Sequence, residues 1–247
     1  MAGHSKFKNI MHRKGAQDRA RAKLFTRLGK EISVATKIGG ADLNSNARLK
    51  SAVSSAKSLN MPKDNINRAI KKGTGNDPDA NFEEIRYEGY GPSGSAIIVE
   101  ALTNNKNRTA SEIRTIFGKN GGVLAENGSV SYNFKKIGVI KMNKNVASEE
   151  EIFNFSIENK STDVETNIDN YLIFCDVQDY HVLLQRLTDK FGHPMSSKII
   201  WKSDSNINIK AEHADTLFKL INILEDNEDV QSVSSNFKLE DKNINEI

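Results

Sequence analysis

The side chains of this sequence that could do chemistry are mostly cations, and they gather near its N-terminus. Arg19, Lys23, Arg27, Lys30 and Lys37 recur at helical spacing and fall in one arc of a helical wheel. Neighbours four residues apart in this arc carry like charges, and each such pair costs about 0.2–0.5 kcal/mol of helix stability. A helix face that is merely solvated usually alternates in sign, so unrelieved positive charge predicts binding to phosphates.

The predicted partner is therefore nucleic acid, either DNA or ribosomal RNA, through shape and backbone contacts, because no base-reading motif is legible. The candidate contact residues are the cations of the N-terminal third, with Phe7 and His12 for base stacking: Lys6, Phe7, Lys8, His12, Arg13, Lys14, Arg19, Lys23, Arg27, Lys30, Arg68, Lys71 and Lys72. A second basic motif places Lys106 and Arg108 at a predicted strand-to-helix junction. A helix N-terminus with these two cations could hold an anion, and a purely structural cap explains the motif equally well.

The charge of the chain is strongly polarised. Residues 1–75 hold 17 Lys and Arg against 4 Asp and Glu, whereas residues 76–247 hold the other 18 Lys and Arg against 28 Asp and Glu. The net charge of +3 over 247 residues hides this asymmetry. We expect the positive third to attract polyanions and the negative remainder to repel them.

Nothing in the sequence predicts an enzyme, a cofactor or a metal site. Gly89-x-Gly91-x-x-Gly94 matches the dinucleotide fingerprint as a string, but Pro92 and an apolar strand follow where the fingerprint needs a helix, so we interpret it as a hairpin turn. The single cysteine, Cys175, lies in an apolar strand and is expected to be buried rather than nucleophilic. No apolar run approaches the roughly 20 residues of a membrane span, and the N-terminus lacks the apolar region of a signal peptide, so we expect a soluble, cytoplasmic protein.

Hydrophobic periodicity predicts a small helical domain followed by mixed structure. Helices are expected at 16–38, after an irregular basic arm, at 46–59 and at 62–73. The first of these helices is predicted to end at Gly39-Gly40. Its apolar residues fall on one stripe: Ala20, Leu24, Phe25, Leu28, Ile32, Ala35 and Ile38. The stretch GTGNDPDAN at 73–81 is typical of a linker.

Beyond the linker the elements alternate between strands and helices. Strands are expected at 84–88, 95–103 and 130–134, and a capping box at Thr109–Glu112 is expected to open a helix. From 137 to 202 the predicted order is β-α-β-β-α-β, as in ferredoxin-like domains. Its two helices are expected from Ser148 to about Asn159 and over Tyr180–Phe191. The predicted fold class is α+β: a small helical N-terminal domain (1–75) and two ferredoxin-like α+β domains, of which one (135–203) is inserted in the other (80–134 plus 204–247).

Four long motifs in this order resemble the YebC/PmpR family of transcriptional regulators, which includes the mitochondrial translational activator of cytochrome oxidase subunit one. They are MAGHSKFKNIMHRKGAQDRARAKLFTRLGKEI, MPKDNINRAIKKGTG, YEGYGPSGSAIIVEALTNNKNRTASEIR and GSVSYNF. The resemblance implies three domains and no enzyme activity, and it marks the segments Gly3–Phe7, His12–Asp18, Ile70–Gly75 and Asn107–Arg114. Phe7 departs from the Trp that is common in the family, and Gly15 from the usual Ala.

Two functions stay open at this point. The usual description of the bacterial members implies a cytoplasmic, DNA-binding regulator of transcription. Other members are linked to translation on the ribosome, which implies a factor that binds structured RNA and relieves stalling. The missing base code favours RNA, whereas the family description favours DNA. A pure protein-interaction scaffold is a weaker alternative because it leaves the positive charge of residues 1–75 unexplained.

Overall fold

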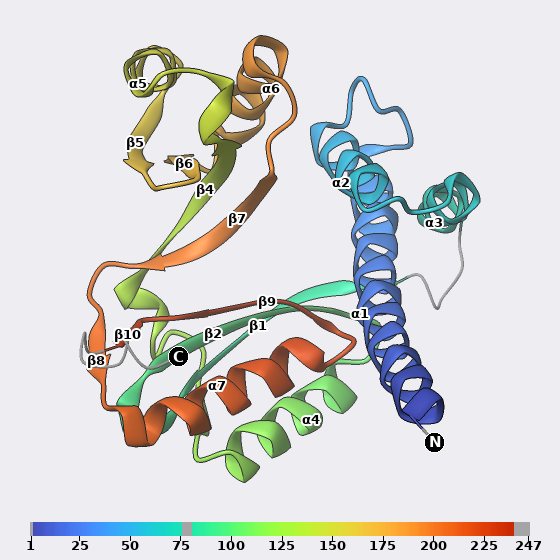
Figure 1. Cartoon of the computed structure of the whole chain (residues 1–247), viewed down its shortest axis with the longest axis vertical. Helices are drawn as coiled ribbons and strands as arrows, with labels where there is room; N and C mark the ends of the chain where they lie inside the picture. Colours follow the sequence, from blue (N-terminus) through green and yellow to red (C-terminus); the bar gives the residue numbers. More distant parts are fainter. Residues whose placement is uncertain (1, 76–80, 240–247) are drawn as a thin grey trace. The chain divides into compact units, whose positions relative to one another are not determined.

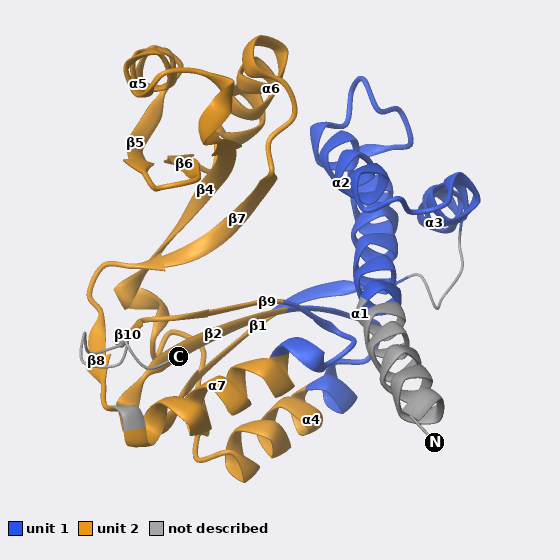
Figure 2. Ribbon diagram, viewed as in Figure 1, with its two compact units in different colours: residues 1–85, 101–109, 225–231 blue, residues 86–100, 110–224, 232–247 orange. Residues whose placement is uncertain are grey.

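The structure is a computed structural model that describes residues 2–75 and 81–239, with side chains throughout these ranges except at 2–20, 211 and 239. Most of the predicted linker, residues 76–80, lies outside the described part. The chain divides into two compact units, which Figure 2 distinguishes by colour. Unit 1 comprises 1–85, 101–109 and 225–231, and unit 2 comprises 86–100, 110–224 and 232–247.

Unit 1 contains three helices near the N-terminus: α1 (Ala2–Gly39), α2 (Ala47–Ser58) and α3 (Lys63–Thr74). The predicted irregular arm was wrong, because α1 already begins at Ala2. The predicted stop at Gly39-Gly40 is confirmed, and Gly40 takes the left-handed conformation (φ +84°) that ends a helix cheaply only at glycine. Asn46 caps α2 by accepting a hydrogen bond from the Leu49 N–H.

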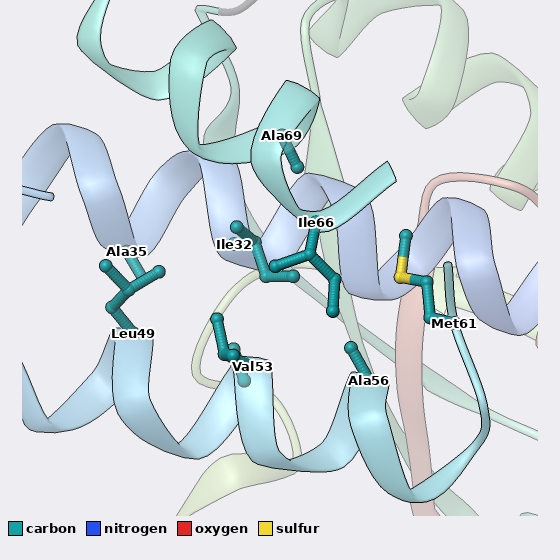
Figure 3. Close-up of a cluster of buried hydrophobic side chains, with 9 residues drawn as sticks. Ile32, Ala35, Leu49, Val53, Ala56, Met61, Ile66 and Ala69 are labelled. Atoms are coloured by element: carbon teal, nitrogen blue, oxygen red, sulfur yellow. The ribbon is translucent and has the colours of Figure 1, made fainter. Parts of the chain in front are cut away.

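The three helices share one apolar core, in which their side chains point toward one another (Figure 3). The core residues are small or branched aliphatic side chains at helical spacing, plus one methionine: Ile32, Ala35, Leu49, Ala52, Val53, Ala56, Met61, Ile66 and Ala69. The apolar stripe predicted for the first helix is buried only in its middle, since Leu24 (41% exposed) and Ile38 (71% exposed) face solvent. Helix α3 packs closely on α1 because Gly73 has no side chain: a Cβ there would lie 2.4 Å from the Ser33 carbonyl oxygen.

The rest of the described chain consists of short strands and helices that form three sheets. After the helices follow β1 (Glu83–Tyr90), β2 (Ala96–Thr103), α4 (Lys106–Lys119), β3 (Val123–Ala125), β4 (Phe134–Asn143), α5 (Glu149–Glu158), β5 (Ser161–Thr166), β6 (Asn170–Asp176), α6 (Tyr180–Phe191), β7 (Ser196–Ser203), β8 (Ile207–Ile209), α7 (Ala211–Asp226), β9 (Val230–Ser235) and β10 (Phe237–Leu239). The first sheet has the strand order β3-β1-β2-β9, the second has β5-β6-β4-β7, and β8 and β10 pair in parallel. Helices α4 and α7 lie side by side along the first sheet (Figure 1).

The predicted β-α-β-β-α-β order is confirmed in the second sheet, where β4, α5, β5, β6, α6 and β7 follow one another. All its strand pairs are antiparallel. Helices α5 and α6 cover one face, and a core that includes Ile140, Tyr171 and Leu183 fills the space between the helices and the sheet. The helix start predicted at Ser148 is also correct, since Ser148 is the N-cap of α5 and its hydroxyl accepts a hydrogen bond from the Glu151 N–H.

Two local predictions were wrong for reasons that lie outside the local sequence. The strand expected at 130–134 is a 3-10 turn at Ser131–Asn133, and the backbone N–H groups of Val130 and Ser131 donate to the buried Glu88 carboxylate at 2.9 Å each. Two short strands, β3 and β10, were missed. The helix expected to open at Thr109 begins at Lys106 instead.

The glycine motif forms a turn, as interpreted from the sequence. A short 3-10 segment, Pro92–Gly94, joins β1 to the adjacent strand β2, and the Gly91 N–H donates to the Ser95 carbonyl. The α+β fold class is therefore confirmed, because sheets and helices follow a helical N-terminal region. The domain boundaries 1–75, 80–134 plus 204–247, and 135–203 stay a prediction. Among the described helices, none is long and apolar enough to cross a membrane.

Candidate nucleic-acid interface

The basic residues predicted to bind nucleic acid fall into four groups in the structure. The first group lies on the N-terminal half of α1, where side chains are outside the described part of the chain. It comprises Lys6, Phe7, Lys8, His12, Arg13, Lys14 and Arg19.

The second group, on the middle of α1, faces an acidic segment of unit 1, residues 225–229. Lys23 Nζ lies 2.6 Å from an Asp226 carboxylate oxygen, and both side chains are largely exposed. The Arg27 guanidinium donates to the Glu225 carbonyl oxygen. Lys30 Nζ donates to the Glu228 carbonyl at 2.9 Å. The repulsion expected between these like charges is therefore offset by a segment that comes about 200 residues later, with sequence separations of 198 to 203.

Asp229 is the centre of this acidic segment. Its Oδ1 lies 2.7 Å from Lys30 Nζ, and its Oδ2 accepts hydrogen bonds from the Arg108 guanidinium and the Thr109 hydroxyl, each at 2.7 Å. Its side chain is only 6% exposed. Burial by itself raises the pKa of Asp229, but the hydrogen bonds from Lys30, Thr109 and Arg108 outweigh burial and hold the pKa at about 2. The carboxylate therefore stays charged and connects α1 to the start of α4.

The third group is the second basic motif, and both of its cations have acidic partners. Lys106 Nζ lies 2.6 Å from a Glu83 carboxylate oxygen, and Arg108 pairs with Asp229. The cap of this helix is Asn105, whose Oδ1 accepts from the Arg108 N–H at 3.1 Å. The capping box predicted at Thr109 was wrong, because the Thr109 side chain is buried and bonded to Asp229. Carboxylates of the chain itself thus stand where the sequence suggested that an external anion could bind.

Of the three groups whose side chains the structure describes, the fourth group, on α3, is the most available to a ligand. Arg68 and Lys71 are exposed, Lys72 is half-buried, and Lys63 adds a further exposed cation. Within the described residues, none of these four forms an ion pair with a carboxylate, and the only acid on the helix is Asp64. Arg68 donates to the side-chain oxygen of its neighbour Asn65.

A pocket of about 450 Å³ opens between α1, α3 and the segment before β1. Three of the predicted residues, Lys30, Arg68 and Lys72, line it together with two aromatic rings, Phe25 and Phe82. Phe25 belongs to the apolar stripe predicted for the first helix, whereas Phe82 is not among the residues predicted to bind nucleic acid. A lone aromatic residue between a linker and an acidic strand was the only signal that Phe82 carried.

Two kinds of reactive group were considered in the sequence, metal ligands and the single cysteine. No three His, Cys, Asp or Glu side chains among them lie close enough to hold a metal ion. Cys175 is fully buried, as expected, and burial, with Asp179 and Asp176 nearby, raises the pKa of its thiol to about 11. Such a thiol is a poor nucleophile at neutral pH.

Comparison with known proteins matches nearly the whole chain. Residues 5–76 match the family model described as the TACO1/YebC protein N-terminal domain, and residues 82–237 match the model described as the TACO1/YebC second and third domain. A crystal structure of a conserved hypothetical protein, Aq1575 from Aquifex aeolicus, is 40% identical in sequence. It has a TM-score of 0.83, and the match covers 91% of this chain and 93% of that one. The motifs of the first 134 residues, the α+β fold and these matches agree, and the chain belongs to the TACO1/YebC family.

Proposed function

We propose that this protein is a non-enzymatic, nucleic-acid-binding regulator of gene expression, and that residues 1–75 make most of the contacts with the nucleic acid. The observation that supports this most is the row of cations on α3. Lys63, Arg68, Lys71 and Lys72 have no carboxylate partner among the described residues, in contrast to Lys23 and Lys30 on α1. Such a surface gives affinity for phosphates without a base code.

The preferred role is regulation of transcription through DNA. The family is transcription-regulator-like, since the model matched by residues 82–237 carries the name Transcrip_reg. Rigid helices with exposed cations can lie along a duplex backbone. The absence of catalysis is part of the proposal, and it fits a family of this kind.

A second candidate is a translation factor that binds structured RNA on the ribosome. The pocket between α1 and α3 favours it, because aromatic rings beside cations suit unpaired bases. Duplex DNA keeps its bases stacked, whereas folded RNA presents unpaired ones in its loops and bulges.

The general proposal is tested with the double variant Lys63→Glu/Lys71→Glu, whose substitutions lie on α3 outside the pocket. We expect affinity for duplex DNA and for folded RNA to fall at least about tenfold, and the slope of log K against log[salt] to become shallower by roughly 1.5, because two phosphate contacts are lost. The control is Lys198→Glu/Lys219→Glu, which makes the same change in net charge at exposed positions of unit 2. Equal losses in the two variants would mean that α3 is not the contact surface.

Competition at physiological salt separates the two roles. The protein is first bound to a labelled candidate promoter, and unlabelled scrambled DNA or intact ribosomes are then added as competitors. A transcription regulator should prefer its promoter over scrambled DNA by a factor of about 10³ or more. Displacement by ribosomes, with little preference between the two DNAs, would establish the translation role instead.

A further inference from the structure

The pocket between α1 and α3 combines two kinds of surface that one ligand class needs together. Its apolar part includes the rings of Phe25 and Phe82, and its charged part includes Arg68 and Lys72. The volume of about 450 Å³ lies within the range of roughly 300–1,000 Å³ that is typical of small-ligand sites. All the lining residues belong to unit 1, so the pocket is a feature of one compact body.

The aromatic rings are half-buried and accompanied by cations. Lys72 Nζ lies 5.5 Å from the centre of the Phe82 ring, and Lys30 Nζ lies 5.7 Å from it. The Arg21 guanidinium lies 5.4 Å from the centre of the Phe25 ring. A planar base that covers the Phe82 ring would release the Lys72 ammonium, on its flexible stem, toward the phosphate of the same nucleotide.

The cations of the pocket differ in their freedom to meet a ligand. Lys30 Nζ lies 2.7 Å from Asp229 Oδ1, and the Lys30 side chain is only 13% exposed. It therefore lines the pocket but is not free to bind a phosphate. Arg68 and Lys72 have no carboxylate partner among the described residues. They are four residues apart in α3 and therefore lie on the same side of the helix, one turn apart. The Arg68 guanidinium offers paired donors to phosphate oxygens, which makes it the better anchor.

Gly29 keeps the pocket open. A glycine inside a helix lowers helix stability relative to alanine, and some helical glycines have a structural reason. At Gly73 the reason is packing, but a Cβ at Gly29 would meet no atom within 4 Å. Gly29 lines the pocket together with Phe25 and Phe82, so we expect a larger side chain there to reduce the free space of the pocket.

We infer that this pocket binds one unpaired nucleotide of a folded nucleic acid, with its base against the Phe25 and Phe82 rings and its phosphate on Arg68 and Lys72. The inference rests on the proposed nucleic-acid binding and makes the second candidate role, binding of structured RNA, more specific. Unpaired bases in bulges and loops are what a duplex lacks, so the pocket would give selectivity for folded strands over a continuous duplex. Stacking on an aromatic ring and contact with a phosphate are both tolerant of base identity.

The test compares hairpins that differ by a single bulged nucleotide, made both as RNA and as DNA, and free AMP as a separate arm. Binding by the full chain is measured by fluorescence anisotropy. We expect the wild type to prefer the bulged hairpin over the fully paired one by about 5- to 150-fold, the range that one stacked base provides. The Gly29→Met variant, whose side chain fills the pocket without changing charge, should lose this preference and keep its affinity for the paired hairpin within twofold.

The matched control is Gly118→Met on α4, another helical glycine whose Cβ would meet no atom within 4 Å. It should keep the preference, and thermal unfolding should show that both variants fold. Phe82→Ala, which removes one of the two aromatic rings, should also reduce the preference for the bulged hairpin. Ultraviolet crosslinking of the bulged base, mapped by mass spectrometry, should identify a peptide that contains Phe25 or Phe82.

The outcomes separate this inference from the proposed function. If the wild type binds both hairpins and Gly29→Met changes neither affinity, the pocket is not the site, although nucleic-acid binding stands. If the wild type binds no hairpin at all, the proposed function and the inference are both wrong. Tight binding of free AMP without any preference for the bulged hairpin would mean that the pocket takes a free nucleotide, which also overturns the inference.

Discussion

Replacing Asp229 with Asn is the most informative single change, because this carboxylate is bonded to two cations and a hydroxyl within unit 1. The amide has nearly the same shape but no charge, and its NH₂ group would face the Lys30 ammonium or the Arg108 guanidinium. Both cations would remain in place without their shared anion. We expect a substantial loss of stability from this change alone.

The size of the loss follows from two independent arguments. Removing one partner of a buried ion pair costs about 3–5 kcal/mol, and an isosteric amide should fall at or below the lower end of that range. The pKa of Asp229 is lowered from 3.8 to about 2, because the hydrogen bonds from Lys30, Thr109 and Arg108 exceed the opposing effect of burial. That shift corresponds to about 2 kcal/mol of stability at pH 7. We therefore expect the free energy of unfolding to fall by about 2–3 kcal/mol.

The pH dependence gives a signature that a simple packing defect would lack. The folded state favours the charged form of Asp229, so the stabilisation is fully present above about pH 4 and is lost as the pH falls toward 2. The difference between the wild type and Asp229→Asn should accordingly shrink over this window. Urea unfolding followed by circular dichroism, at pH 7 and at intervals down to pH 2.5, measures it.

The control is Asp226→Asn, which removes the partner of Lys23. The Asp226 side chain is 71% exposed. Exposed ion pairs contribute about 0–1 kcal/mol, so this variant should stay close to the wild type. The reasoning would be refuted if Asp229→Asn were no less stable than Asp226→Asn at pH 7. It would also fail if the loss were the same at pH 2.5 as at pH 7.

Three further experiments, two with variants and one with a thiol reagent, test other parts of the structure. Gly73→Ala should lower the free energy of unfolding by about 1–3 kcal/mol, since its Cβ would lie 2.4 Å from the Ser33 carbonyl, and urea unfolding beside Gly29→Ala, which has room for its methyl group, checks this. Glu88→Gln should cost about 2 kcal/mol at pH 7 and progressively less toward pH 2. Burial raises the pKa of Glu88, but backbone hydrogen bonds outweigh it and hold the pKa at about 2, so an unchanged urea midpoint at pH 7 would contradict the assignment. Cys175, buried and with its pKa raised to about 11, should react with a thiol reagent at pH 8 only as fast as the protein unfolds, and rapid labelling of the folded protein would contradict its burial.

Local sequence predicted the elements whose signals are complete within a few residues. Helix α6 (Tyr180–Phe191) was predicted with its observed bounds, because its apolar residues recur at helical spacing and Gly192 follows it. The helix start at Ser148 was correct for a similar reason, because the Ser148 hydroxyl and the Glu151 N–H that it accepts from lie three residues apart. Such interactions form between neighbours in the chain, so the sequence contains all the information needed to predict them.

The failures share a cause that is not local. The segment around Val130 reads as a strand, but the Glu88 carboxylate, 42 residues earlier, takes its N–H groups and turns the chain. Thr109 looks like a helix cap, but its hydroxyl is used by Asp229, 120 residues later, and Asn105 caps the helix instead. In each case a buried carboxylate without hydrogen bonds would cost more free energy than the loss of the locally predicted structure.

The same division holds for the candidate site. The sequence alone determined that residues 1–75 carry the positive charge of the chain, because charge depends only on composition. It could not determine which of those cations are available to a ligand, since the partners of Lys23 and Lys30 lie 203 and 199 residues away along the chain. Nor could it bring Phe25 and Phe82 to one pocket, which requires α1, α3 and the start of β1 to meet. Ion pairing and pocket shape depend on distances in space, and only the tertiary structure sets those distances.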